Sequence, residues 1–365
     1  MPAEEPIAPP PEAATRLVGH AAAEDTFLRA FSAGRMPHAW LLTGPKGIGK
    51  ATLAFRMARF LLAQRPAADG GLFGDAPAPA ASLEMPAGDP VFRRVRELAH
   101  SDLRVLRRSL NDKGKLRSEI VVDDVRAAID FLHMTPAESL WRVMVVDPVD
   151  EMKRNAANAL LKILEEPRPH TVLILVSHAP GRLLPTIRSR CRKLALQPLN
   201  DNLLATELGR VLPDLATADR QLAAVLAEGS LGRAITLAGD GGLALFRGIG
   251  RLFNTWPHLD TGDLHKLADQ VGGKGGETAF ETGTEMLGWW MMRFARLSAA
   301  HRLPETELFS GETQLIQRLQ QAGSLDRWLD LWEKVNRLFA RVASANLDRR
   351  QAWLTGWLLI ETAGR

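Results

Sequence analysis

The sequence predicts a parallel α/β nucleotide-binding sheet in the first half of the chain and helices alone in the second half. Residues 143–146 and 171–176 are apolar on both faces, which is typical of strands that helices cover on both sides. Residues 155–166, between these strands, supply the crossover helix that parallel strands require. Strand patterns stop after Pro198, which predicts the helical second half.

The composition is that of an ordinary globular protein. The 365 residues, 46% hydrophobic and 24% charged, are enough for two or three packed domains. Lys and Arg number 46 against 42 Asp and Glu, and the net charge of +4 permits a nucleic acid or acidic partner without requiring one.

Several features bear on localisation. A single cysteine, Cys191, excludes an intramolecular disulfide and a multi-cysteine zinc site, and it suits a reducing compartment. No apolar run approaches the ~20 residues of a membrane helix, and the start lacks the basic and apolar regions of a signal peptide. We therefore expect a cytoplasmic protein without membrane association. Residues 1–15, rich in Pro, Ala and Glu, are expected to form a disordered tail.

Helices and strands are predicted to alternate through residues 16–199, as in an α/β domain. The first elements expected are helices at 16–33, 52–62 and 91–99 and strands at 39–43 and 103–106. Residues 67–89 are rich in Ala, Gly and Pro without a sustained period, so we expect a flexible insertion there.

A phosphate loop follows the first predicted strand. The pattern GxxxxGK is formed by Gly44, Gly49 and Lys50, with Gly47 inside it, and a helix comes directly after. Glycines let backbone N–H groups converge on phosphate oxygens, the lysine adds a charge for the terminal phosphates, and the start of the helix favours anions.

This phosphate loop is incomplete. Ser or Thr normally follows the lysine and holds Mg²⁺, but Ala51 stands there and Thr52 comes one position late. Two interpretations remain open. The loop binds ATP or ADP with Mg²⁺ at a degenerate site, or it survives only as a tight turn.

The second half is predicted to form two helical units, residues 200–242 and 243–365. In the latter, large apolar residues recur at spacings of three and four, which predicts a packed core or subunit interface rather than a cofactor site. These residues are Met286, Trp289, Trp290, Phe294, Leu297, Trp328, Leu331, Trp332, Val335, Leu338, Phe339 and Val342.

Two motifs carry a family resemblance. The run NALLKILEEP from Asn158, followed by a turn into Ser189-Arg190-Cys191, closely resembles the clamp-loader branch of the AAA+ ATPases. The segments RMPHA from Arg35 and ANLDRRQ from Ala345 add to this resemblance, which extends from about Leu17 to the end of the chain.

The resemblance implies one subunit of a hetero-oligomeric ring that opens a sliding clamp and places it on primed DNA. Implied partners are the gamma or tau ATPase subunits, a delta subunit, the clamp and, through the complex, DNA. Residues 16–199 would be the AAA+ domain, 200–242 the lid and 243–365 the collar. Arg190, in the Ser189-Arg190-Cys191 motif, would be an arginine finger that acts on the ATP site of a neighbouring subunit.

The family's catalytic acids are only partly present. Asp147 ends a predicted strand at the position where the family holds an acid near Mg²⁺, but Pro148 replaces the glutamate expected to orient the attacking water. Glu151 lies nearby, although it would have to reach back from the following turn.

Other family features also differ. Ser177 is an acceptable polar residue at the end of its strand, but the arginine expected in the lid is displaced, with Gly232 in its place and Arg233 one later. The four-cysteine zinc module of many relatives is absent. Because Ala51, Pro148 and Gly232 each affect a different catalytic part, we expect no ATP hydrolysis and no required cofactor.

Three functions fit the sequence to different degrees. The first is a ring subunit that does not hydrolyse ATP and supplies Arg190 to its neighbour. The alternative is a self-sufficient AAA+ ATPase motor that uses Lys50, Asp147 and Glu151. A sequence-specific DNA-binding protein has little support, because neither a recognition helix nor a concentrated basic face is visible.

Overall fold

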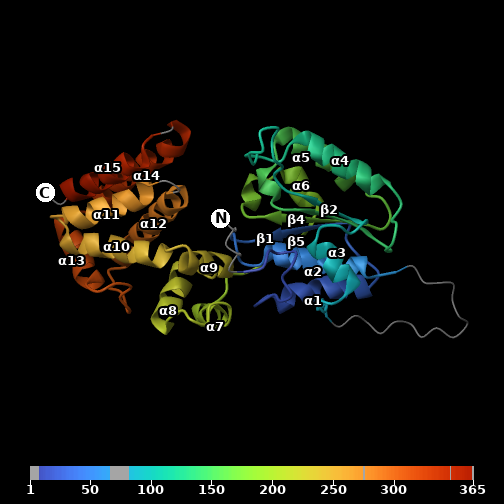
Figure 1. The fold of residues 1–365 in the computed structure, drawn as a ribbon, viewed down its shortest axis with the longest axis horizontal. Helices are drawn as coiled ribbons and strands as arrows, with labels where there is room; N and C mark the ends of the chain where they lie inside the picture. Colours follow the sequence, from blue (N-terminus) through green and yellow to red (C-terminus); the bar gives the residue numbers. More distant parts are fainter. Residues whose placement is uncertain (1–7, 66–81, 274–275, 346, 364–365) are drawn as a thin grey trace, which may run out of the picture. The chain divides into compact units, whose positions relative to one another are not determined.

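The computed structural model describes residues 8–65, 82–273, 276–345 and 347–363. Contacts divide the chain into two compact units, the first formed by Met1–Asn200 with Gly229–Arg233 and the second by Asp201–Glu228 with Ala234–Arg365 (Figure 1). The further division of the second unit into a lid and a collar remains a prediction. In the part of the chain that is described, none of the helices combines the length and apolar character needed to cross a bilayer.

The first unit contains a five-stranded sheet in the order β2-β3-β4-β1-β5, and every pairing is parallel. Its strands are β1 (Ala39–Thr43), β2 (Leu103–Leu106), β3 (Arg142–Val146), β4 (Thr171–Ser177) and β5 (Arg192–Ala195). The predicted parallel α/β fold is therefore confirmed. Strand β5 was not predicted, because this edge strand exposes three of its four residues and lacks an apolar run.

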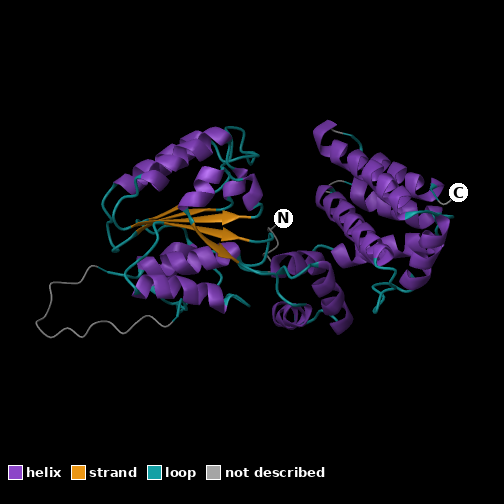
Figure 2. Ribbon diagram, turned by 180° about the vertical axis from the view of Figure 1, so that it is seen from behind, coloured by secondary structure: helices purple, strands orange, loops and turns teal. Residues whose placement is uncertain are grey.

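Helices cover both faces of this sheet (Figure 2). Along β1, Trp40 and Leu42 point to one core and Ala39 and Leu41 to the other, as the two-residue period of a strand requires. Helices α1 (Ala21–Ser32), α2 (Lys50–Leu62) and α3 (Pro90–Arg96) pack on the first face, and α4 (Val122–His133), α5 (Arg154–Glu165) and α6 (Pro185–Arg190) on the second.

The predicted disordered tail is wrong for residues 8–15, whereas residues 1–7 lie outside the described residues. Glu12 is 8% exposed and pairs with Arg107, and the backbone carbonyls of Ala14 and Thr15 accept hydrogen bonds from α2. The segment is ordered because arginine side chains bind it, which a composition rich in Pro and Ala does not reveal. The helix predicted over 16–33 begins only at Ala21.

The predicted insertion at 67–89 is only partly open to comparison, since residues 66–81 lie outside the described residues. The remainder, residues 82–89, is ordered. Leu83 is buried in the core beside α2, and the Asp89 carboxylate accepts hydrogen bonds from Val91 N and Phe92 N at the start of α3. An N-cap of this kind fixes the entry of the chain into the helix.

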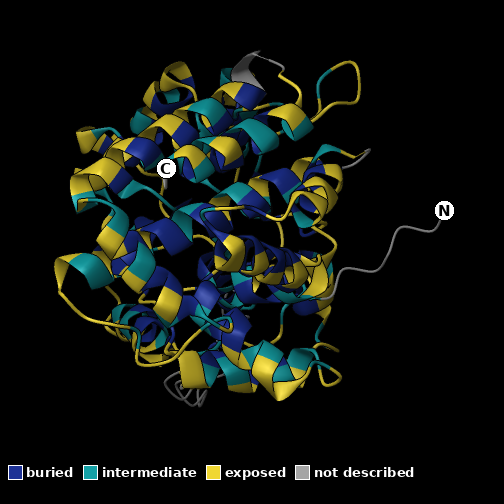
Figure 3. Ribbon diagram, turned by 90° about the vertical axis from the view of Figure 1, so that its left-hand side faces the viewer, coloured by how far each residue is buried: buried dark blue, intermediate teal, exposed yellow. Residues whose placement is uncertain are grey.

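The second unit is helical throughout its described residues, as predicted, and its helices alternate buried and exposed faces (Figure 3). Of the predicted aromatic pattern, Trp290, Phe294 and Trp328 are buried, which confirms their role in packing, whereas Trp289 and Trp332 are partly exposed. Trp353 and Trp357 are also buried in this core. The helices that enter it are α7 (Asp201–Val211), α8 (Thr217–Leu226), α9 (Leu231–Gly239), α10 (Gly242–Thr255), α11 (Thr261–Gly272), α12 (Glu277–Ala299), α13 (Glu312–Ala322), α14 (Leu325–Ala345) and α15 (Arg349–Thr362).

Candidate functional site

The predicted phosphate loop connects β1 to α2. Gly44, Gly47 and Gly49 have φ angles of 143°, 79° and 105°, a region that side-chain-bearing residues rarely occupy. The loop therefore has the glycine-dependent conformation that the pattern predicts. Thr52 lies in the first turn of α2, one residue beyond Ala51.

Lys50 turns back onto its own loop. Its side chain is 2% exposed, and Nζ donates to the carbonyl oxygen of Gly44 at 2.7 Å and to that of Pro45. Burial lowers the pKa of Lys50 to about 8, against the opposing charges of Asp147 and Asp150. The lysine is thus held by protein carbonyls where the pattern anticipates phosphate.

The turn at Gly229–Arg233 packs directly on the phosphate loop. Gly232 N donates to Gly47 O at 2.9 Å, and Ser230 Oγ donates to Lys46 O at 2.8 Å. A Cβ on Gly232 would lie 3.1 Å from Gly47 Cα. The sequence pattern suggests that Gly232 stands where a catalytic arginine is expected, but its backbone touches the loop, and a side chain there would require the loop to shift by a few tenths of an ångström.

Asp147, at the end of β3, is paired with an arginine. Its Oδ2 lies 3.4 Å from Arg107 Nη2, and Arg107 also binds Glu12. Burial raises the pKa of Asp147, and the charge of Arg107 acts in the opposite direction. The sequence predicts neither Arg107 as the partner of Asp147 nor Glu12 as the second partner of Arg107, because both residues come from segments that carry no motif.

The other candidate acid near this strand, Glu151, is also engaged. Its Oε2 lies 2.8 Å from Arg108 Nε. Asp150 Oδ1 accepts from Ser177 Oγ at 2.7 Å, and its Oδ2 accepts from the backbone N–H groups of His178 and Ala179. Ser177, at the end of β4, is therefore bonded to Asp150. Lys50 Nζ donates to loop carbonyls rather than to Asp150 or Glu151.

These residues do not fit a magnesium nucleotide in the manner of an active phosphate-loop enzyme. Ala51 provides no hydroxyl for the metal, Asp147 is neutralised by a guanidinium, and Pro148 has no acidic side chain.

His178 makes the stability of this region dependent on pH. Burial and the charges of Lys50 and Lys46 lower the pKa of His178 to about 4, despite the opposing charge of Asp150. Between pH 6.5 and 4 the unfolded chain therefore binds a proton that the folded chain does not, and stability falls with falling pH. His178 is only partly buried, so we discount the full linkage energy and expect His178→Asn to lessen the acid-induced loss of unfolding free energy by about 1 kcal/mol. Urea unfolding of both proteins at about pH 7 and about pH 4.5 measures it, and equal losses would contradict the assignment.

The Ser189-Arg190-Cys191 motif lies at the end of α6, where the sequence predicts a turn. Arg190 Nη2 is 2.8 Å from Glu165 Oε1, and Nη1 donates to Thr186 O at 3.1 Å. The Arg190 side chain is 36% exposed, so its guanidinium is accessible. Cys191 is partly buried and packs against the core on the second face of the sheet, and burial raises the pKa of its thiol to about 12.

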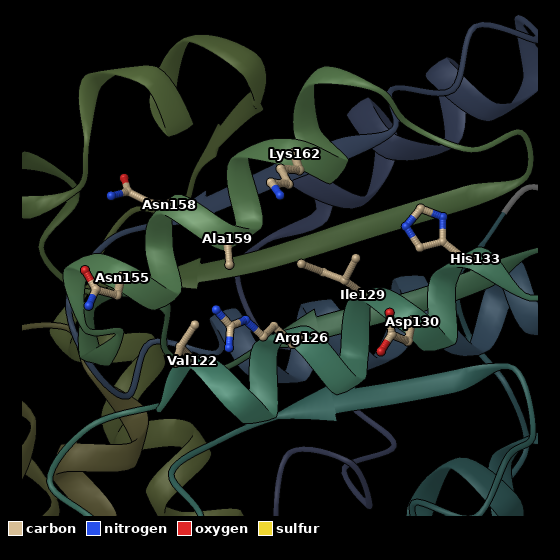
Figure 4. Close-up of a pocket in the computed structure, with 9 residues that line it drawn as sticks. All are labelled: Val122, Arg126, Ile129, Asp130, His133, Asn155, Asn158, Ala159 and Lys162. Atoms are coloured by element: carbon tan, nitrogen blue, oxygen red, sulfur yellow. The ribbon is translucent and has the colours of Figure 1, made fainter.

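A separate groove of about 570 Å³ lies between α4 and α5 (Figure 4). Its lining includes Arg126, Lys162, Asn155 and Asn158, and Ile129 supplies part of its apolar surface. None of the residues predicted for the phosphate loop or the finger lines this groove.

The chain is similar to subunits of DNA polymerase III. Residues 19–200 match the family model described as DNA polymerase III, delta subunit. The delta prime subunit of DNA polymerase III from Pseudomonas aeruginosa is 43% identical over 178 residues, which cover 48% of this chain and 48% of that protein. The tau subunit of DNA polymerase III from Escherichia coli is 26% identical over 312 residues, or 82% of this chain and 44% of the relative. The chain thus spans about half the length of these relatives.

Among solved structures, a DNA polymerase III gamma subunit-related protein from Thermotoga maritima aligns with 93% of this chain and 99% of its own, at 20% identity and a TM-score of 0.42. The RuvB Holliday junction branch migration motor from the same organism aligns with 72% of this chain and 80% of its own, at 15% identity and a TM-score of 0.39. Likenesses of this size do not place functional residues.

Proposed function

Over residues 19–200 this chain belongs to the DNA polymerase III delta subunit family, and we propose on that premise that it is a delta prime subunit of a clamp loader. In this role it assembles a ring and supplies Arg190 to the ATP site of a neighbouring subunit. It does not hydrolyse ATP itself. The ring would support loading of a sliding clamp onto primed DNA.

The observation that carries this proposal is the contrast between the phosphate-loop site and the Ser189-Arg190-Cys191 motif. In the phosphate-loop site, the residues expected to hold a nucleotide are bound to the protein: Lys50 to its own loop and Asp147 to Arg107. In that motif, Arg190 is 36% exposed on α6, where it pairs with Glu165 and donates to a backbone carbonyl. A planar, permanently charged guanidinium suits the stabilisation of a transferring phosphoryl group.

The proposed partners follow from the same relationship. They are gamma or tau subunits, a delta subunit, the sliding clamp and primed DNA. The helices of the second unit would hold the ring together, and their buried tryptophans make that part a rigid support. The self-sufficient motor is less well supported, because Glu151 already pairs with Arg108.

Turnover by the isolated chain tests the non-hydrolysing role. We expect the purified chain to release no phosphate from ATP above a buffer blank, with or without Mg²⁺, because Ala51 supplies no metal-binding hydroxyl and Pro148 no base. Lys50→Ala should give the same result. Steady turnover by the wild-type chain that Lys50→Ala abolishes would establish the motor instead.

A further inference from the structure

We propose that Arg107 is a built-in replacement for the divalent cation at Asp147, and that the N-terminal segment 8–20 locks it there, so that the chain's phosphate-loop site is closed by the chain itself. This inference deepens the proposed function, because it gives the physical reason for a silent site. It rests on that function only for its biological meaning, since the contacts and the test concern the isolated chain.

The first support is the position of the guanidinium. Arg107 follows β2 directly, and β2 pairs with β3, so its side chain reaches the carboxylate that ends the neighbouring strand. Nη2 lies 3.4 Å from Asp147 Oδ2. The side chain also packs over Phe55 of α2, with 5.4 Å between the guanidinium carbon and the ring centroid.

The second support is the bidentate pair with Glu12. Nη1 donates to Oε1 at 3.1 Å and Nη2 to Oε2 at 2.9 Å, the two parallel bonds that arginine and carboxylate form best. Glu12 is 8% exposed and the Arg107 side chain 33%, so water screens this pair only in part. The guanidinium thus lies between two carboxylates, from Glu12 and Asp147.

The third support is the cradle that holds the segment. Arg59 of α2 donates to the carbonyl oxygen of Ala14 at 2.8 Å, and Arg56 donates to that of Thr15 at 2.7 Å. The two arginines are 1% and 3% exposed. Arg56 also pairs with Glu24 of α1, and the hydrogen bonds of these two buried cations to the segment make it an integral part of the domain.

The segment then continues onto the phosphate loop. His20 Nε2 is 2.7 Å from Ile48 O, and a Cβ on Gly49 would lie 2.8 Å from Leu17 Cδ1. One continuous stretch therefore contacts the loop through Leu17 and His20 and holds Arg107 through Glu12. A divalent cation bound at Asp147 would meet the positive charge of Arg107 at short range and would have to displace it.

The experiment separates this closure from the missing hydroxyl at Ala51. Three proteins are compared: Ala51→Thr, the double variant Ala51→Thr with Arg107→Met, and the matched control Ala51→Thr with Arg108→Met. Methionine keeps the apolar stem against Phe55 and removes the charge. Arg108 is the adjacent arginine, but it pairs with Glu151. Binding of fluorescent ADP is measured with and without Mg²⁺, together with the melting temperature of each chain.

We expect Mg²⁺ to tighten ADP binding by about tenfold or more only in the double variant that lacks Arg107. Its melting temperature should also rise when Mg²⁺ and ADP are added. Full Mg²⁺ dependence in Ala51→Thr alone, or in the Arg108 control, would overturn the proposal. So would a folded Arg107 double variant that does not respond to Mg²⁺.

Glu12→Gln in the Ala51→Thr background provides a second route if the Arg107 variant does not fold. It keeps the side-chain volume and weakens the lock, so we expect a smaller Mg²⁺-dependent gain than with Arg107→Met. No gain in this folded variant would count against the locking role of the segment. Neither measurement uses ring assembly, so a failure here leaves the role of Arg190 untouched, and a failure of that role leaves this result intact.

Discussion

Arg190→Ala is expected to reduce ATP turnover at the neighbouring subunit's site by at least about 10³-fold, the lower end of what an arginine finger contributes. The reason is electrostatic. The alanine variant leaves the charge that develops on the transferred phosphoryl group without its guanidinium. Turnover should be measured in rings where only the site adjacent to Arg190 can hydrolyse ATP, so that other sites do not mask the loss.

The chain offers a matched control for this substitution. Arg188 lies on the same short helix, α6, is exposed and carries the same charge. We expect Arg188→Ala to keep turnover within about twofold of the wild type, since an exposed charge two residues away makes no contact with the reacting phosphate. Equal losses for the two variants would point to a general effect of charge on assembly rather than to a finger.

Gly47→Ala is expected to destabilise the first unit by about 3 kcal/mol, the sum of a left-handed backbone and a steric overlap. The new Cβ would lie 2.4 Å from Ser230 Oγ and 3.2 Å from Arg233 N. The turn that packs on the phosphate loop would have to move away, and its hydrogen bonds to Lys46 and Gly47 would be lost. Urea unfolding monitored by circular dichroism measures the change.

Two other glycines separate the causes of that loss. Gly114 has a φ of 70° with nothing within 4 Å of where a Cβ would lie, and Gly181 has open space without a positive φ. We expect Gly114→Ala to cost about 1 kcal/mol and Gly181→Ala to stay within about 0.5 kcal/mol of the wild type. If Gly47→Ala cost no more than Gly114→Ala, the tight contact with the turn would be refuted.

The architecture of the first unit could be predicted because its strands are marked by composition. Strands β1, β3 and β4 are apolar on both faces, and glycines announce the loop that follows β1. Strand β5 carries no such signal, since only Leu194 is buried and its pairing with β1 depends on contacts distant in sequence. Pairing at an edge is set by tertiary structure more than by local pattern.

The candidate site was predicted only as far as its motifs extend. The glycines and Lys50 occur in a recognisable spacing, so the loop between β1 and α2 could be predicted, whereas Arg190 was recognised by its motif but lies on a helix that the sequence does not predict. The link between Glu12 and Arg107 joins residues 95 positions apart, and its strength comes from burial and bidentate geometry. A segment that appears disordered by composition becomes ordered when buried arginines bind its carbonyls.

Gly232 shows how a family pattern can mislead. Counting along the motif suggests a lost arginine, a defect in chemistry. The structure gives the position a packing role, because the Gly232 N–H bonds to Gly47 O and its Cα lies against the loop. The consequence for function is similar, since no side chain reaches the site from this position, but the physical cause is close backbone approach.

One comparison tests most directly whether the chain lacks a working ATP site of its own and supplies Arg190 to the ATP site of a neighbouring subunit. Lys50→Ala and Arg190→Ala are each introduced into this chain alone, and clamp-dependent ATP turnover is measured in rings built with otherwise unchanged partners. We predict that Lys50→Ala rings match the wild type and that Arg190→Ala rings lose turnover at the adjacent site. Loss with Lys50→Ala and full activity with Arg190→Ala would contradict the account.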